Sequence, residues 1–286
     1  MMKKIGALVL ALALALSLTA CGQKAEQTTV QEEPESGEAE PVELVVFAAA
    51  SMTETLTEIA DLYKDAAPNV TLTFNFGSSG TLLTQIEEGA ECDLFISAAS
   101  TQMNALDGTL AQDVEKNPDG LDMLVPGSRI DLLENKVTLA VPEGNPKGIE
   151  SFDQLAQLLA DGAVFLAMGN SDVPVGQYTQ KIFAYYGLDE AAVAEAGVLT
   201  YGSDVKEVTT QVSEAAVDCG VIYATDAFSA GLTVVDSATP EMCGQVIYPA
   251  AVIQGGNEEA AQAFLDYLQT DEAMAVFESV GFSPAF

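Results

Sequence analysis

The chain has 286 residues, with 10 basic and 43 acidic side chains, no histidine and a formal net charge of −33. Binding to a phosphate backbone requires clustered lysine and arginine, so we expect no nucleic-acid partner. A sequence without histidine also excludes a histidine-ligated zinc site and a histidine-based catalytic triad.

The first twenty residues predict export from the cytoplasm. Lys3 and Lys4 precede an apolar run over residues 5–18, and small residues follow that run. This order is typical of a secretory signal peptide, and the run is shorter than the roughly 20 apolar residues of a spanning helix. We therefore predict a signal peptide over residues 1–20.

Cys21 directly follows this segment, and the tetrapeptide Leu18-Thr19-Ala20-Cys21 resembles a bacterial lipobox. The resemblance implies that Cys21 becomes a diacylated N-terminus, and two acyl chains are enough for stable membrane anchoring. The alternative is an ordinary signal peptide with an incidental cysteine. We expect an extracytoplasmic protein that is lipid-anchored to the cell membrane.

Residues 21–43 follow as a predicted tether. Residues 23–43 hold seven glutamates and one lysine, and they offer almost nothing that could join a core. Such a composition cannot offset chain entropy by burial, so we expect disorder. Without Lys3 and Lys4, 8 basic residues face 43 acidic ones, and the mature net charge becomes −35.

From residue 44 onward, short apolar runs alternate with amphipathic stretches. The apolar runs predict strands over residues 44–47, 70–76, 93–97, 137–141, 164–168, 219–223 and 245–253. Helical spacing of apolar residues predicts helices starting near residues 52 and 82, and over 176–186, 205–216, 258–269 and 271–280. This alternation indicates an α/β protein with mostly parallel sheets, whose ligands bind at the carboxyl ends of strands.

Two turns, each between a predicted strand and a predicted helix, are candidate anion-binding sites. Residues 47–54 (FAAASMTE) place Ser51 and Glu54 at the spacing of a helix capping box, so either a plain helix cap or a hydroxyl facing an anion is possible. Residues 76–82 (FGSSGTL) combine two glycines with three hydroxyls, which fits either an anion cradle or a flexible surface turn.

Three further segments are weaker signals. Residues 172–178 and 203–207 each precede a predicted helix, and residues 220–226 contain a strand that ends at Tyr223. The usual role of such a tyrosine is core packing with its hydroxyl bonded to the backbone.

Taken together, five segments resemble the periplasmic molybdate-binding proteins of ABC transporters: VFAAASMTETLTEIA, FGSSGTLLTQIEEGAECDLFISA, DVPVGQYTQ, GVIYATDA and YPAAVI. The resemblance covers essentially all of residues 44–286. It implies a two-lobed type II periplasmic-binding-protein fold, in which each lobe is a mixed, mostly parallel sheet flanked by helices. Two crossover strands would join lobe I (residues 44–137 and 247–286) to lobe II (residues 138–246), with the ligand in the cleft between them.

The same resemblance implies a site for molybdate or tungstate built from neutral donors. Ser51 and Ser79 would supply hydroxyl and backbone donors, Val175 and Val205 backbone N–H groups, and Tyr223 its phenolic hydroxyl. Family members often carry alanine where Val175 stands; the backbone donor survives this change, although a larger side chain narrows the site. The implied partner is an ABC transporter permease. We expect no further cofactor, and we expect a monomer.

Three other functions stay open at this stage. The first is a binding protein for another small anion, such as sulfate or an organic anion. The second is a hydrolase that uses Ser79, which the lack of histidine and of a G-x-S-x-G motif disfavours, so we predict no enzymatic activity. The third is an adhesin or structural lipoprotein without a small ligand.

Three cysteines follow Cys21, namely Cys92, Cys219 and Cys243, and they show no CxxC spacing. Cys219 and Cys243 are the one pair close in sequence. A disulfide between them and buried free thiols are both compatible with the sequence.

Overall fold

The computed structural model describes residues 40–286. The predicted signal peptide, the lipidation of Cys21 and all but the last residues of the predicted tether lie outside the described residues and stay predictions. No helix within residues 40–286 is both long enough and apolar enough to cross a membrane.

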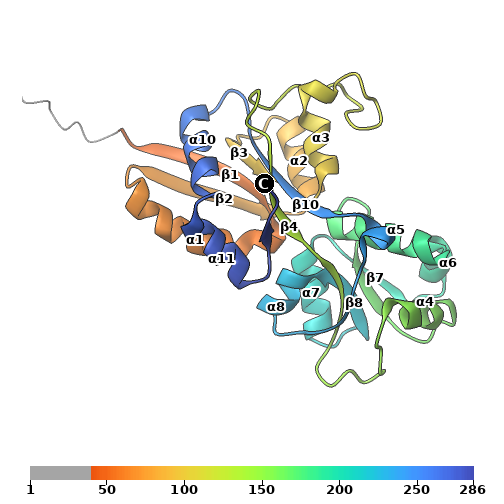
Figure 1. Cartoon of the computed structure of the whole chain (residues 1–286). Coiled ribbons are helices and arrows are strands. Elements are labelled where there is room, and N and C mark those ends of the chain that lie inside the picture. Colours follow the sequence, from red (N-terminus) through yellow and green to blue (C-terminus); the bar gives the residue numbers. More distant parts are fainter. Residues whose placement is uncertain (1–39) are drawn as a thin grey trace, which may run out of the picture. The chain divides into compact units, whose positions relative to one another are not determined.

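The first of two mixed β-sheets has six strands in the order β11-β4-β10-β3-β1-β2 (Figure 1). Its strands are β1 (Val42–Ala49), β2 (Val70–Gly77), β3 (Leu94–Ile96), β4 (Ile130–Asn135), β10 (Val246–Val252) and β11 (Ser283–Pro284). β1 pairs in parallel with β2 and β3, whereas β10 runs antiparallel to β3 and β4. The parallel strands therefore end at one common edge, close to the second sheet.

Helices cover both faces of this sheet, which explains the continuous apolar run in β1. Leu44 and Val46 pack into one core with three helices, α1 (Thr53–Ala66), α10 (Glu258–Tyr267) and α11 (Asp271–Ser279). Val45 and Phe47 point the opposite way and pack against α2 (Ser79–Glu87) and α3 (Ser100–Leu106). Successive strand residues face opposite sides, so a strand buried on both faces needs apolar residues at every position.

The second sheet has five strands in the order β7-β6-β8-β5-β9. Its strands are β5 (Val137–Val141), β6 (Leu166–Gly169), β7 (Leu199–Gly202), β8 (Cys219–Tyr223) and β9 (Thr233–Ser237). The flanking helices are α4 (Phe152–Ala160), α5 (Pro174–Tyr186), α6 (Glu190–Glu195), α7 (Val205–Ser213), α8 (Ala224–Ser229) and α9 (Pro240–Cys243). Two short 3-10 helices, η1 (Ala50–Met52) and η2 (Gly108–Leu110), belong to the first half of the chain.

The chain passes between the two sheets twice. β4 ends at Asn135 and β5 begins at Val137, so Lys136 alone separates a strand of one sheet from a strand of the other. The return runs from β9 through α9 into β10, and Asn135 lies opposite Val246 in the β4–β10 pair. The predicted fold, two mixed sheets flanked by helices and joined by two crossovers, is confirmed. The residue boundaries of the two lobes stay a prediction.

All three described cysteines are buried free thiols, so the predicted alternative of a disulfide between Cys219 and Cys243 is wrong. Burial raises the pKa of Cys92 and of Cys219 to about 12. Because the thiolate is the reactive form, these two thiols are expected to be inert at neutral pH.

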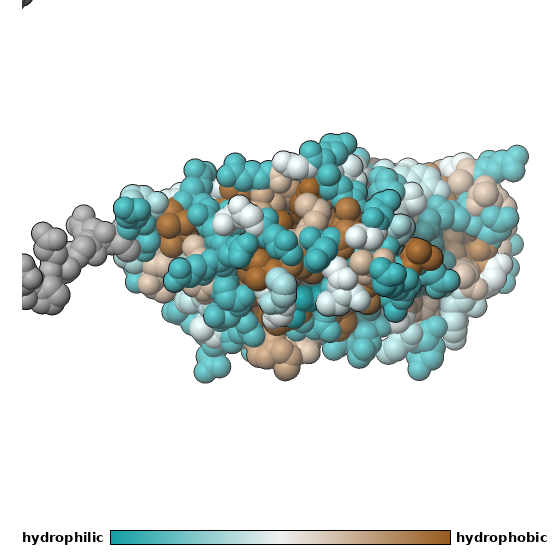
Figure 2. Space-filling model, turned by 90° about the horizontal axis from the view of Figure 1, so that it is seen from above, coloured by the Kyte–Doolittle hydropathy of each residue, from teal (hydrophilic) through white to brown (hydrophobic). Residues whose placement is uncertain are grey.

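Polar side chains cover most of the face shown in Figure 2, and apolar residues lie between them in small groups. This surface agrees with the acidic composition.

Candidate functional site

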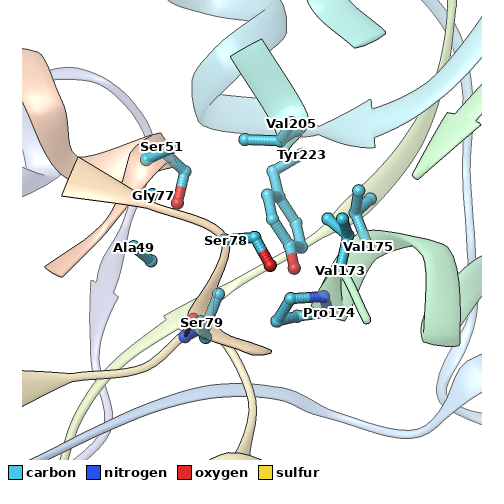
Figure 3. Close-up of a pocket in the computed structure, with 12 residues that line it drawn as sticks. Ala49, Ser51, Gly77, Ser78, Ser79, Val173, Pro174, Val175, Val205 and Tyr223 are labelled. Carbon is cyan, nitrogen blue, oxygen red and sulfur yellow. Dashed lines mark hydrogen bonds between the residues drawn. The ribbon is translucent and has the colours of Figure 1, made fainter. Parts of the chain in front are cut away.

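A small pocket lies where the strands of both sheets end, and Figure 3 shows the residues around it. Its lining consists of Ala49, Ala50, Ser51, Gly77, Ser78, Ser79, Ala98, Val173, Pro174, Val175, Val205 and Tyr223. The pocket has a volume of about 10 Å³, close to the smallest size that holds one water molecule. None of these lining residues of the described chain carries a charged side chain.

Three helices begin at this pocket, namely α2 at Ser79, α5 at Pro174 and α7 at Val205. The first four N–H groups of an α-helix have no partner within the helix, and the N-terminus carries a partial positive charge. The pocket therefore collects backbone donors and positive helix ends from both sheets, although it contains no lysine or arginine.

Ser79 presents a hydroxyl donor to the pocket. Its side chain is almost completely buried, and its Oγ accepts a hydrogen bond of 2.9 Å from the backbone N–H of Ala98. A backbone N–H can only donate, so this bond uses a lone pair of Ser79 and leaves the hydroxyl proton free.

Ser51 lies in η1, directly after β1, and lines the same pocket. Its local structure decides between the two interpretations of residues 47–54. The predicted capping box is wrong, because α1 is preceded by Met52 at its N-cap and no side chain caps it. The Ser51 hydroxyl lies 2.9 Å from the hydroxyl of Tyr248, and Glu54 binds Lys206 instead of the backbone. Neither residue of the S-x-x-E pattern is used for capping.

Val175 and Val205 place backbone N–H groups in the first turns of α5 and α7. At the start of α7, neither capping group uses the N–H of Val205. The Asp204 carboxylate accepts from the N–H of Glu207, and the Glu207 carboxylate accepts from the N–H of Ser203. In α5, Pro174 occupies the first turn, where a missing N–H costs nothing.

Gly176 lies in the first turn of α5, where the helix meets the end of β6. A Cβ at this position would overlap the backbone carbonyl oxygens of Gly169 and Asn170. The glycine therefore allows the first turn of α5 to pack closely against the end of β6, and this packing holds Val175 at the pocket.

Tyr223 ends β8 and is fully buried, yet its hydroxyl has no hydrogen-bond partner within residues 40–286. Its ring lies edge-on to two other tyrosines, with ring centroids 6.4 Å from Tyr178 and 5.7 Å from Tyr248. Burial raises the pKa of Tyr223 well above its ordinary value, so the hydroxyl keeps its proton. The alternative of a hydroxyl bonded to the backbone is wrong.

A buried hydroxyl without a partner costs about 1–3 kcal/mol, which makes an absent ligand the simplest partner for Tyr223. The structure thus brings all five predicted residues, Ser51, Ser79, Val175, Val205 and Tyr223, to one pocket. That they bind an anion stays a prediction.

Side chains also join the two halves around the pocket, through contacts that no sequence pattern predicts. Ser78 Oγ donates to the backbone oxygen of Asp172 at 3.2 Å, and Gln102 Nε2 lies 3.3 Å from Gln177 Oε1. Each contact connects an element of the first sheet with one of the second, so the structure shows the two halves closed over the pocket.

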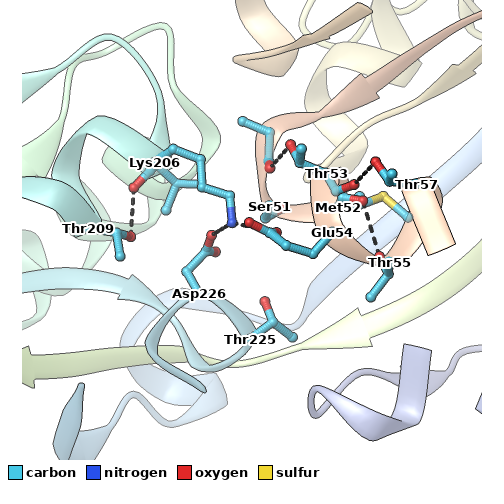
Figure 4. A network of polar contacts seen from close by, with 12 residues as sticks. Ser51, Met52, Thr53, Glu54, Thr55, Thr57, Lys206, Thr209, Thr225 and Asp226 are labelled. Atoms are coloured by element: carbon cyan, nitrogen blue, oxygen red, sulfur yellow. Dashed lines mark hydrogen bonds and ion pairs between the residues drawn. The ribbon is translucent and has the colours of Figure 1, made fainter. Parts of the chain in front are cut away.

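The shortest of these contacts is an ion pair, which Figure 4 shows in detail. Lys206 Nζ lies 2.7 Å from Glu54 Oε2 and 3.1 Å from Asp226 Oδ1. Burial opposes the charge on Lys206, but Asp226 and Glu54 outweigh burial and raise its pKa. Lys206 thus links α1 of the first half to α7 and α8 of the second.

Asp226 is completely buried in this network. Burial raises its pKa from 3.8 to about 6, although Lys206 acts in the opposite direction. Within residues 40–286, no cluster of three or more carboxylates and thiols is arranged to hold a metal ion.

Comparison with known proteins gives the class. The family model for bacterial extracellular solute-binding proteins matches residues 44–283. The Bacillus subtilis protein YvgL, assigned as an ABC transporter substrate-binding lipoprotein, is 31% identical over 99% of both chains. The molybdate-binding protein ModA of Haemophilus influenzae is 31% identical, covering 84% of this chain and 89% of its own. The chain belongs to the bacterial extracellular solute-binding protein family.

Further relatives bear on the ligand. A sulfate-binding protein of Synechococcus elongatus is 25% identical over 96% of this chain and 81% of its own. A substrate-binding domain from Clostridium difficile, assigned to a molybdenum ABC transporter, has a TM-score of 0.61 at 30% identity and covers 86% of this chain and 100% of that one. The resemblance to molybdate-binding proteins that the sequence motifs predicted is confirmed.

The raised pKa of Asp226 predicts a specific pH dependence of stability. The folded protein holds the Asp226 proton more tightly than the unfolded chain, whose aspartate titrates near 3.8. The contribution of Asp226 to the free energy of unfolding therefore falls as pH rises from about 4 to about 6. Asp226→Asn abolishes this titration, so the Tm difference, variant minus parent, should increase by several degrees across that window.

Calorimetry over a pH series measures this difference. Asp266→Asn, which changes an exposed aspartate on α10, is the matched control, and its Tm difference should stay flat. A flat or falling difference for Asp226→Asn would show that Asp226 is already ionised in the folded protein at pH 4.

Proposed function

We propose that this chain captures molybdate or tungstate between its lobes and delivers it to an ABC importer. The observation that carries the proposal is the chemistry of the pocket, whose free polar groups are hydrogen-bond donors without a cation. Ser51, Ser79 and Tyr223 would supply hydroxyls, and Val175 and Val205 would supply backbone N–H groups.

A fully ionised tetrahedral oxyanion accepts hydrogen bonds and donates none, so a cage of neutral donors satisfies it. Each charge-assisted bond contributes about 1.5–3 kcal/mol net, and five give roughly 7–15 kcal/mol. Three helix N-termini add about 0.3–1 kcal/mol each. A micromolar site needs about 8 kcal/mol, so the donor set suffices even after part of it is spent on lobe closure.

The same cage explains why an acidic protein binds an anion. The donors lie within hydrogen-bond reach of the ligand, whereas salt screens charges farther away than about 8–10 Å. The cage also disfavours hydrogen phosphate, because its proton would find no acceptor, and a buried unpaired donor costs about 1–3 kcal/mol.

Sulfate is the second candidate, and one observation favours it. The cavity of about 10 Å³ is tight, and sulfate is the smaller dianion. The sulfate-binding relative from Synechococcus elongatus supports the same reading. Against it stand the molybdate-binding relatives, which are more similar to this chain. We favour molybdate, because these relatives share more of this chain's sequence than the sulfate-binding relative does.

Delivery to a permease rests on the relatives, one of which is assigned as an ABC transporter lipoprotein. The predicted end of the tether at residue 43 is wrong, because Val42 and Glu43 already belong to β1. We propose that Cys21 carries the lipid anchor at the outer face of the cell membrane and that the residues between Cys21 and β1 tether the folded part. The folded monomer would then consist of lobe I (44–137 and 247–286) and lobe II (138–246).

Isothermal titration calorimetry with molybdate, tungstate, sulfate and phosphate tests the proposal. We expect one-to-one binding of molybdate, with sulfate and phosphate weaker by about 1000-fold, or about 4 kcal/mol. Ser79→Ala should weaken molybdate binding about 10- to 100-fold, because one charge-assisted donor is lost. Ser213→Ala, which removes an exposed hydroxyl at the end of α7, should leave the affinity unchanged.

Tight binding of sulfate with weak binding of molybdate would favour the second candidate. A folded protein that gives no heat with any oxyanion would refute both candidates, and small organic anions would then be the next ligands to test.

Closure of the lobes gives a separate prediction at Gly80. A Cβ on Gly80, in α2 of the first half, would overlap the backbone carbonyl oxygen of Asp172, which precedes α5 in the second half. Gly80→Ala should therefore hold the lobes apart and weaken molybdate binding by at least 10-fold. Small-angle scattering should show a larger radius of gyration for the variant than for the parent, both at saturating molybdate.

Glu87→Ala is the matched control, because it shortens an exposed side chain at the end of the same helix, α2, and adds no atom toward Asp172. If Gly80→Ala closes and binds as the parent does, the contact between Gly80 and Asp172 does not limit closure.

A further inference from the structure

Tyr248 lies directly behind the pocket, on the crossover strand β10, and does not line the cavity. Its side chain is fully buried, and its hydroxyl lies 2.9 Å from Ser51 Oγ and 3.3 Å from Asn135 Nδ2. The distance to Ser51 leaves open which hydroxyl donates. The direction matters, because a serine that donates to Tyr248 would turn only lone pairs toward an anion.

Asn135 decides this direction. Its Oδ1 accepts a hydrogen bond of 2.8 Å from the backbone N–H of Lys136, which fixes the orientation of the amide. Its Nδ2 therefore faces Thr225 Oγ1 at 2.9 Å and the hydroxyl of Tyr248. An amide nitrogen can only donate, so the oxygen of Tyr248 is an acceptor in its contact with Asn135.

The proton of Tyr248 then has one acceptor among the described residues, which is Ser51 Oγ. Burial raises the pKa of Tyr248 well above its ordinary value, so this proton is retained. Ser51 Oγ thus accepts from Tyr248, and the structure gives the Ser51 proton no other protein acceptor within residues 40–286.

We propose that Tyr248, held by Asn135, is a positioning residue that forces Ser51 to act as a donor toward the bound anion. The proposal rests on the proposed function as an oxyanion-binding protein. Ser79 shows the same arrangement with a different partner, because the N–H of Ala98 occupies its oxygen. In both serines a protein donor occupies the oxygen and the proton is left for the ligand.

The location of this chain of hydrogen bonds adds a link to lobe closure. Asn135 ends β4 at one crossover, Tyr248 lies on β10 at the other, and Thr225 belongs to α8 beside the second sheet. Asn135, at a crossover between the lobes, thereby orients the Ser51 donor of the first lobe through Tyr248. Its amide also contacts Thr225 of the second lobe.

Selectivity should depend on this orientation. Without the Tyr248 proton, the Ser51 hydroxyl is free to rotate and accept a hydrogen bond from a protonated anion. Tyr248→Phe should therefore weaken molybdate binding about 5- to 10-fold and weaken phosphate binding less, so that the ratio of the two affinities falls.

A double-mutant cycle with Ser51→Ala tests the mechanism, with calorimetric titration of molybdate and phosphate. If Tyr248 acts through the Ser51 hydroxyl, Tyr248→Phe should have no further effect on molybdate affinity once Ser51 is alanine. Tyr63→Phe, a buried tyrosine in the core beside α10, is the matched control and should change neither affinity.

An equal loss in both backgrounds, or no loss in the parent, would overturn the proposal, because a merely structural role predicts the same factor in each. If Tyr248→Phe does not fold, Asn135→Ala gives the same comparison, with an expected loss of about 2- to 5-fold that also disappears in Ser51→Ala. A folded parent that binds no oxyanion would refute the proposed function itself, and this inference with it.

Discussion

An anion held without a counter-ion needs donors whose protons have no acceptor in the protein, and the free polar groups of the pocket fit this requirement. Ser79 meets it through the N–H of Ala98, and Tyr223 meets it because no protein group competes for its hydroxyl. The first turns of α5 and α7 meet it through unpaired backbone N–H groups. Since every donor is neutral or part of the backbone, the pocket needs no lysine or arginine.

The fold brings these donors together because strands of both sheets end at the pocket. Two crossovers lie side by side, with Lys136 alone separating β4 from β5, so the two halves share a short hinge. Two glycines allow the close approach of backbone segments around the pocket. Gly176 lets α5 pack against β6, and Gly80 lets the backbone of Asp172 approach α2. The Lys206 ion pair with Glu54 adds a charged contact across the closed halves.

Much of this architecture is predictable from local sequence. The apolar run in β1 reads as a buried strand because both of its faces contact helices, and the strands Val137–Val141 and Cys219–Tyr223 have the predicted bounds. Strands β4, β7, β9 and β11 were not predicted. β4 carries Asp131 and Glu134 among its apolar residues, and the other three strands are short and partly or fully exposed, so none of the four shows a clear apolar run.

The family motifs predicted five residues that the structure brings to one pocket, but they did not predict the contacts that support these residues. The S-x-x-E pattern at Ser51 suggested a cap, whereas the structure pairs Ser51 with Tyr248, 197 residues away. No periodicity or spacing in the sequence predicts a contact between residues so far apart in the chain. The same holds for Lys206 and Glu54, which are 152 residues apart, and for the burial of Asp226, whose raised pKa arises from tertiary packing.

The most direct test of a cation-free oxyanion site is a crystal structure of the protein grown with tungstate, with data collected at a tungsten absorption edge. We predict one strong anomalous peak in the pocket, within hydrogen-bond reach of Ser51, Ser79, Tyr223 and the first-turn N–H groups of Val175 and Val205. A peak beside lysine or arginine side chains, or an empty pocket in a protein that binds tungstate in solution, would contradict it.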